Sequence, residues 1–77
     1  MAKVTIYSTP TCVFCHMAKQ YFKSHNVEYS EKDVTLDQAA LHEMVHKSGQ
    51  MGVPVIDIDG EITVGFDQPR LASLLKL

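Results

Sequence analysis

The stretch Tyr7-Ser8-Thr9-Pro10-Thr11-Cys12-Val13-Phe14-Cys15 decides the fold class, because it places a C-x-x-C motif between two different periodicities. Before the motif, residues 3–8 carry alternating apolar side chains and predict a strand. After it, residues 13–25 have apolar side chains at helical spacing, and Asn26 is a typical stop. A C-x-x-C beside a strand–helix–strand pattern is the sequence cue for a thioredoxin-like fold.

A second strand and a second helix are predicted next. Residues 27–33 contain enough β-forming residues for a strand, which would close a parallel βαβ unit with the first strand and helix. Thr35 followed by Gln38 resembles a capping box, and Gly49 is placed to end the helix that follows.

The remaining third of the chain predicts a hairpin and a last helix. Residues 53–58 and 61–64 read as strands, and the intervening Asp59-Gly60 is a favoured hairpin turn. Residues 67–77 begin with an Asp cap and carry leucines on one face. The predicted order is β-α-β-α-β-β-α, an α/β thioredoxin-like fold in which three helices flank a four-stranded mixed sheet.

Size and charge narrow the possible functions. With 77 residues and 8.6 kDa, the chain is expected to be one domain, residues 1–77. Seven Lys and Arg against nine Asp and Glu, with no basic block, predict no nucleic-acid partner. No apolar run approaches the roughly 20 residues of a membrane span, so no membrane partner is expected. Without a signal-peptide pattern, the expected location is the reducing cytoplasm, where cysteine pairs are usually catalytic or metal-binding.

The two cysteines are predicted to have different chemical roles. They lie too close in sequence to stabilise a small fold as a disulfide staple, because cross-link stabilisation grows with the enclosed loop. At the start of a helix, Cys12 would meet unpaired N–H groups and the positive end of the helix dipole, which favour a nucleophilic thiolate. A helical projection places Cys12 opposite the apolar face and Cys15 at its flank, as a shielded resolving thiol.

Other titratable residues allow alternative readings. His16 and Lys19 could add positive potential beside the thiolate, but ordinary solvated helix residues would look the same. His42 and His46 complete a set of zinc ligand types with the cysteines, yet their separation from the cysteine pair is too long for a zinc finger. No metal-ligating residue is therefore predicted, although two chains could share an iron–sulfur cluster through exposed cysteines.

Two loops are candidate substrate sites. Pro54, in Gly52-Val53-Pro54, is either a cis proline or a simple strand-start proline, and the residues alone do not decide between them. If this loop lies opposite Cys12, the backbone of Val53 could pair with an extended peptide. The N-terminus of the helix after Gly65-Phe66-Asp67 could hold a carboxylate, whereas the plainer interpretation is an Asp N-cap.

Taken together and in this order, these segments resemble the glutaredoxins, specifically the short single-domain bacterial type. The resemblance covers nearly the whole chain and implies a disulfide oxidoreductase with Cys12 as nucleophile and Cys15 as resolving thiol. It also implies a cis Pro54, glutathione as electron donor, no permanently bound cofactor, a monomer, and disulfide-containing proteins as partners. The glutathione-binding residues that it implies are Thr11, Val13, Phe14, Val53, Pro54, Gly65, Phe66 and Asp67.

Three positions depart from the usual glutaredoxin pattern. Val13 stands for a proline, Phe14 for a tyrosine and Thr9 for a lysine, so one glutathione carboxylate lacks its expected partner. Val13 and Gly65-Phe66 are also similar to redoxins that take electrons from thioredoxin reductase and reduce ribonucleotide reductase. The alternatives that stay open are therefore such a redoxin or an iron–sulfur or metal carrier.

Overall fold

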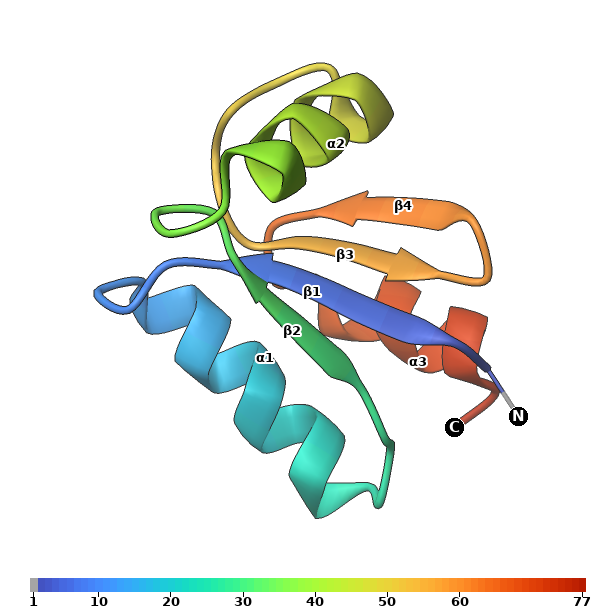
Figure 1. Cartoon of the computed structure of the whole chain (residues 1–77). Helices are drawn as coiled ribbons and strands as arrows, with labels where there is room; N and C mark the ends of the chain where they lie inside the picture. Colours follow the sequence, from blue (N-terminus) through green and yellow to red (C-terminus); the bar gives the residue numbers. More distant parts are fainter. Residues whose placement is uncertain (1) are drawn as a thin grey trace.

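Four strands form one mixed sheet in a computed structural model, which describes residues 2–77 (Figure 1). The order across the sheet is β2-β1-β3-β4. The strands are β1 (Val4–Ser8), β2 (Ser30–Asp33), β3 (Val55–Ile58) and β4 (Glu61–Val64). The helices are α1 (Val13–Ser24), α2 (Gln38–Ser48) and α3 (Gln68–Leu75). The predicted element order and fold class are confirmed.

The strand register brings separate parts of the sequence to one edge of the sheet. Strand β1 is parallel to β2 and antiparallel to β3, and β3 is antiparallel to β4. Tyr7 pairs with Val55, which pairs in turn with Val64. The chain leaving β1, the chain entering β3 and the chain leaving β4 therefore meet at the same edge.

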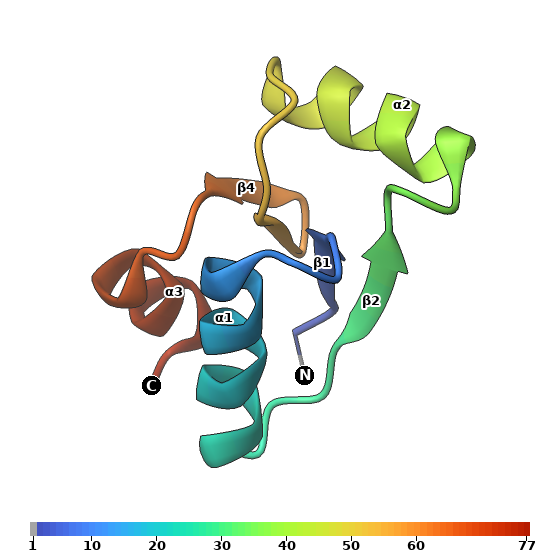
Figure 2. The same ribbon diagram turned by 90° about the vertical axis from the view of Figure 1, so that its left-hand side faces the viewer.

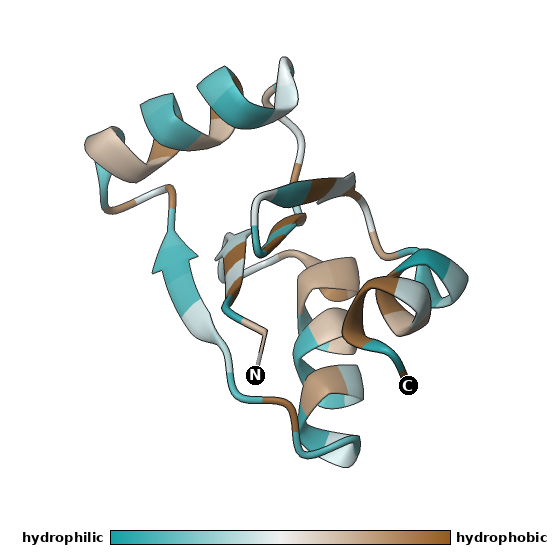
Figure 3. Cartoon of the chain, turned by 90° about the vertical axis from the view of Figure 1, so that its right-hand side faces the viewer, coloured by the Kyte–Doolittle hydropathy of each residue, from teal (hydrophilic) through white to brown (hydrophobic). Residues whose placement is uncertain are grey.

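The helices cover the two faces of the sheet unequally (Figure 2). Helices α1 and α3 share one face, where the main core includes Ile6, Phe22 and Leu71. Helix α2 alone covers the other face, over a smaller cluster that includes Tyr7 and Met44. Side chains alternate between these cores along the inner strands, whereas the edge strand β2 is hydrophilic throughout (Figure 3). Polar contacts also join α2 to the sheet.

A charged network around the buried Tyr7 supplies those polar contacts. The Tyr7 hydroxyl donates a hydrogen bond to the Glu43 carboxylate and accepts one of 3.2 Å from Lys47. Lys47 also forms a 2.7 Å ion pair with Asp57, and Lys32 forms one of 3.1 Å with Glu43. The hydrogen bond from Tyr7, aided by Lys32, lowers the pKa of Glu43 to about 2. The charged residues of this network line a hollow of about 490 Å³, and neither cysteine is among its lining residues.

Three predicted boundaries are wrong for physical reasons. Asp37, not Thr35, caps α2, because its carboxylate accepts the Ala40 N–H at 3.1 Å, the usual N-cap spacing. Thr35 is instead bonded to Asp33 in the turn before the helix.

The second strand also starts later than predicted, at Ser30 rather than residue 27. The apolar side chains of Val27 and Tyr29 pack against the core without ladder pairing, since pairing with β1 begins at Thr5 and Ser30. The third strand likewise begins at Val55, after Pro54, which has no N–H to donate to a ladder.

The predicted helix stops are confirmed. Asn26 after α1 and Gly49 after α2 both adopt left-handed backbone, at φ 57° and 74°. Asparagine and glycine tolerate this conformation better than other residues, which is why they end helices. None of the helices within residues 2–77 has the length and apolar character needed to cross a membrane.

Candidate active site

The candidate site lies at the sheet edge where the three chain segments meet. The loop from Thr9 to Cys12 follows β1, the Val53–Pro54 segment precedes β3, and Gly65–Asp67 follows β4. The Gly65 N–H donates a 2.8 Å hydrogen bond to the Pro54 carbonyl, which ties the last two segments together. The structure thus places the sequence-predicted loops beside one another at the end of β1.

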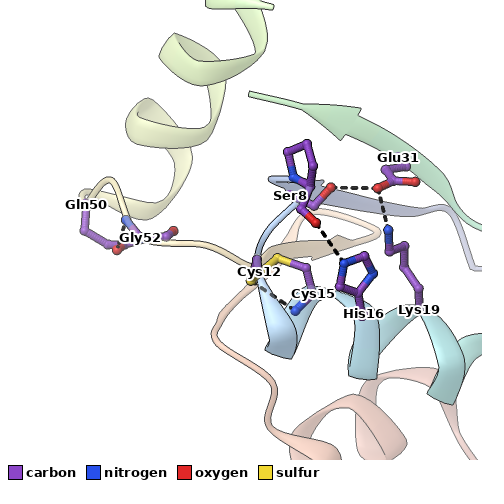
Figure 4. Close-up of a disulfide and its surroundings, with 9 residues drawn as sticks. Ser8, Cys12, Cys15, His16, Lys19, Glu31, Gln50 and Gly52 are labelled. Carbon is purple, nitrogen blue, oxygen red and sulfur yellow. Dashed lines mark hydrogen bonds and ion pairs between the residues drawn. A yellow bond between two sulfur atoms is a disulfide. The ribbon is translucent and has the colours of Figure 1, made fainter. Parts of the chain in front are cut away.

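Cys12 and Cys15 lie at the start of α1 with different exposure. Cys12 is the N-cap residue and is half-buried, whereas Cys15, one turn later, is completely buried. Their sulfurs are joined in a disulfide, with the Cα atoms 5.2 Å apart (Figure 4). The Cys15 N–H donates a 3.1 Å hydrogen bond to the Cys12 sulfur. A donor at this position favours negative charge on that sulfur once the disulfide is reduced.

The Val53–Pro54 peptide bond is cis, as the family resemblance implied. Pro54 is buried and Val53 is half-buried. Within residues 2–77, neither the N–H nor the carbonyl of Val53 has a hydrogen-bond partner. An unpaired donor and acceptor on one backbone unit can pair with an added strand.

Asp67 acts as the N-cap of α3. One of its carboxylate oxygens accepts the Arg70 N–H at 3.2 Å, and its backbone carbonyl accepts the Leu71 N–H at 2.9 Å. The predicted Asp N-cap is therefore confirmed. Gly65 has φ 84°, a conformation that glycine adopts without strain, and its N–H is occupied by Pro54.

An apolar groove of about 550 Å³ runs from the Cys12 end of α1 toward α3. Val13, Met17 and Phe66 are among its lining residues, and Phe66 packs edge-on against Tyr21 at a ring separation of 5.8 Å. Val13 and Phe66 thus share one surface. Phe14 is exposed but does not line this groove, and Thr11 is an exposed residue of the loop before Cys12.

The polar residues near the cysteines already have partners (Figure 4). A ring nitrogen of His16 lies 3.0 Å from the Pro10 carbonyl and so braces the loop before Cys12. The Lys19 ammonium forms a 2.8 Å ion pair with Glu31, which also accepts a 2.8 Å hydrogen bond from the Ser8 hydroxyl. The bond from Lys19, aided by Ser8, lowers the pKa of Glu31. Lys19 is therefore engaged in fixing α1 to β2.

One residue near the site was not anticipated from the sequence. The side chain of Gln50 bonds to the backbone of Gly52, just before Val53 (Figure 4). A polar residue in a loop after a helix is usually solvated, so nothing in its sequence context signals this contact.

The histidines of the metal alternative lie outside this site. His42 and His46 are exposed on α2. Across residues 2–77, no group of three or more His, Cys, Asp or Glu side chains is arranged to hold a metal ion.

Comparisons with known proteins agree on one family. The family model described as Glutaredoxin matches residues 4–63. A glutaredoxin-like 8.6 kDa protein of the rubredoxin operon of Clostridium pasteurianum is 44% identical over 95% of this chain and 97% of its own length. Glutaredoxin 3 of Escherichia coli K12 is 39% identical over 87% of this chain and 81% of its own length. The glutaredoxin-like protein NrdH of Lactococcus lactis is 32% identical over 92% of this chain and 97% of its own length.

A solved structure has the same fold. The crystal structure of the thioredoxin-like protein BC3987 superposes with a TM-score of 0.88 at 35% sequence identity. The match covers 94% of this chain and 99% of that one.

Proposed function

This chain belongs to the glutaredoxin family, and we propose that it is a glutathione-dependent thiol–disulfide oxidoreductase acting through Cys12 and Cys15. One observation carries the proposal. The half-buried Cys12 sulfur, at a helix N-terminus, lies one turn before the fully buried Cys15, at the edge where the Val53 and Gly65 loops meet. This arrangement gives an accessible attacking sulfur, a protected second sulfur and a neighbouring surface for the substrate.

The first proposed step is attack by the Cys12 thiolate on a substrate disulfide. A bond forms between the Cys12 sulfur and one substrate sulfur, and the substrate's own S–S bond breaks. The second substrate sulfur leaves as a thiolate and takes a proton from water. The Cys15 N–H, 3.1 Å from the Cys12 sulfur, stabilises the attacking anion before this step.

Resolution and re-reduction follow. The deprotonated Cys15 attacks the Cys12 sulfur of the mixed disulfide, which breaks the bond from Cys12 to the first substrate sulfur, releases that sulfur as a thiolate and forms the Cys12–Cys15 disulfide present in the structure. Two glutathione thiols then reduce this disulfide to the dithiol and leave as oxidised glutathione. The substrate is thus reduced by two electrons that glutathione supplies.

The substrate surface of this proposal comprises the neighbouring loops. The unpaired backbone groups of Val53 would bond to the backbone of glutathione or of a peptide beside its reacting cysteine. Thr11, Val13, Phe14, Pro54, Gly65, Phe66 and Asp67 would complete the binding surface. We further propose that the protein works as a monomer in the reducing cytoplasm without a resident cofactor, with glutathione and disulfide-containing proteins as partners.

A second candidate function is a redoxin that thioredoxin reductase reduces and that donates electrons to ribonucleotide reductase. Two observations favour it. NrdH of Lactococcus lactis is 32% identical over nearly the full length. In addition, residues 7–15, 50–54 and 64–68 contain no Lys or Arg to bind the carboxylates of glutathione.

A donor assay tests the proposal. Purified protein is given a disulfide substrate and NADPH, with either glutathione plus glutathione reductase or thioredoxin reductase alone. Faster turnover with glutathione supports the proposed function, whereas turnover with thioredoxin reductase only would favour the redoxin. An absorption spectrum and metal analysis of the freshly purified protein test the carrier alternative, because a stoichiometric iron–sulfur cluster would point to it.

A further inference from the structure

The side-chain amide of Gln50 bonds to both backbone polar groups of Gly52 (Figure 4). The Gly52 N–H donates to Gln50 Oε1 at 2.5 Å, and Gln50 Nε2 donates to the Gly52 carbonyl at 3.0 Å. A neighbouring β-strand would offer the same donor and acceptor pair. Gln50 therefore occupies the hydrogen bonds that Gly52 could otherwise give to an incoming strand.

The amide is itself anchored to the end of α2. Gln50 Nε2 also lies 3.3 Å from the Ser48 hydroxyl oxygen, and that hydroxyl donates to the Met44 carbonyl at 2.7 Å. Ser48 is the last residue of α2. A chain of hydrogen bonds thus runs from the helix through Gln50 to Gly52.

Residue 52 must be small for this arrangement. A Cβ added at Gly52 would lie 2.7 Å from Gln50 Oε1, which is closer than real contacts allow, so the amide would have to move. The neighbouring Val53 differs from Gly52, because its N–H and carbonyl have no partner among the described residues. The two hydrogen bonds from the Gln50 amide to Gly52, here called the clamp, therefore leave Val53 as the residue of this loop whose backbone N–H and carbonyl are free to pair with a substrate.

We propose that Gln50 is a positioning residue that fixes the register in which a substrate backbone pairs with this loop. By saturating Gly52, it restricts pairing to Val53, the residue directly before the buried Pro54 at the Cys12 edge of the sheet. This inference rests on the proposed function and adds to it a residue that acts through the loop and touches no reacting atom.

Kinetics with a glutathionylated peptide test this role. Gln50→Ala frees Gly52 to compete for the substrate and lets the loop move, so KM should rise about tenfold while kcat stays within twofold of wild type. Gln50→Glu keeps an acceptor for the Gly52 N–H but cannot donate to its carbonyl when ionised, and should raise KM about threefold. Gln38→Ala, at the other end of α2, is the matched control and should leave both constants unchanged.

Amide hydrogen exchange tests the clamp without any assay of turnover. The Gly52 amide should exchange at least tenfold faster in Gln50→Ala than in wild type, with the melting temperatures of the two proteins within about 3 °C. Wild-type KM in Gln50→Ala, or unchanged Gly52 exchange, would overturn the proposal. If wild-type protein reduced no disulfide at all, the proposed function would fail, and the clamp would be judged by amide exchange alone.

Discussion

The backbone N–H of Cys15 donates a 3.1 Å hydrogen bond to the sulfur of Cys12, so the more accessible thiol of the pair is also the side chain that caps α1. The same atom therefore has two roles, one in helix stability and one in the proposed chemistry. The two roles are compatible because a thiolate is a charged acceptor, which a helix N-terminus favours. Substitutions of Cys12 should separate them.

Cys12→Ser should keep the cap, and Cys12→Ala should lose it. Serine is among the best N-cap residues, whereas alanine leaves the Cys15 N–H without its acceptor and costs about 1 kcal/mol. For a domain of this size, that loss lowers the melting temperature by about 4–8 °C. Thermal denaturation of both variants against reduced wild type measures the difference. Equal melting temperatures for the two variants would show that the cap contributes nothing.

Cys12→Ser and Cys15→Ser should lose different activities. Cys12→Ser should abolish all disulfide reduction, because it removes the attacking sulfur. Cys15→Ser should still remove glutathione from a glutathionylated peptide, since a second glutathione can resolve that adduct, but should lose dithiol reduction of a protein disulfide. Both activities are followed by NADPH consumption with glutathione reductase. Wild-type rates in Cys12→Ser would refute the mechanism.

Reduction of the Cys12–Cys15 disulfide should change stability little. The bond closes a very short loop, and we expect the Cys12 sulfur to remain the helix cap after reduction, because a thiolate is also an acceptor for the Cys15 N–H. Native disulfides of small domains contribute about 2–5 kcal/mol to the free energy of unfolding. A shift in melting temperature below about 5 °C would therefore show that the Cys12–Cys15 disulfide contributes less than they do. Calorimetry with and without a phosphine reductant gives the shift. A fall above 10 °C would mean that the pair is structural.

Thr9→Lys should strengthen binding of glutathione. The Thr9 carbonyl already accepts the Cys12 N–H at 3.3 Å, so a change of side chain leaves this backbone bond in place. A new ammonium beside a site that lacks Lys and Arg should lower KM for a glutathionylated peptide about threefold to tenfold at low ionic strength. The gain should shrink in 0.5 M salt, which screens exposed charges. Ser73→Lys, on α3, controls for net charge, and an equal gain there would refute the argument.

Glu43→Gln should destabilise the protein at neutral pH and not in acid. The pKa of Glu43 is about 2 in the folded state, below the ordinary value of about 4.3, mainly through the Tyr7 hydrogen bond. Its stabilisation is therefore present above pH 5 and is lost as the pH falls toward 2. Because the carboxylate is partly exposed, we expect a loss of about 1 kcal/mol at pH 7.

Urea denaturation across pH 2–7 measures this effect. The gap between wild type and Glu43→Gln should be widest near pH 7 and should close by pH 2. Glu61→Gln is a suitable control, because Glu61 forms no ion pair among the described residues. A gap that does not change with pH would show that the shape of the amide, and not the missing charge, destabilises the variant.

Much of this arrangement follows from short-range sequence signals. The C-x-x-C pair beside helical periodicity predicts which sulfur faces outward, because at 100° per residue Cys12 falls opposite Tyr21, near which the apolar face of the helix is centred. The hairpin and the Asp67 cap depend on local turn and capping chemistry, which is also readable. The N-cap of α2 is predicted wrongly at Thr35 because two capping patterns overlap in this stretch. The local sequence does not distinguish them, and the folded chain uses Asp37.

Longer-range features are not encoded in such local patterns. The bond from Gly65 to Pro54 requires the β3–β4 register, and no single segment specifies it. Gln50 is a polar loop residue whose partners depend on how the chain turns after Gly49. The sequence also leaves the start of β2 undecided, because burial of Val27 looks the same with or without ladder pairing.

The meeting of three distant segments at one sheet edge has a consequence for protein synthesis. Both cysteines precede Asp67, the last residue of the candidate site, by more than 50 residues. At about 5–20 residues per second, the ribosome needs several seconds to add that length of chain. During those seconds the nascent chain carries both thiols without the loops of the proposed substrate surface. Under the proposed function, the segment that is made last therefore completes the substrate surface beside thiols that were made first.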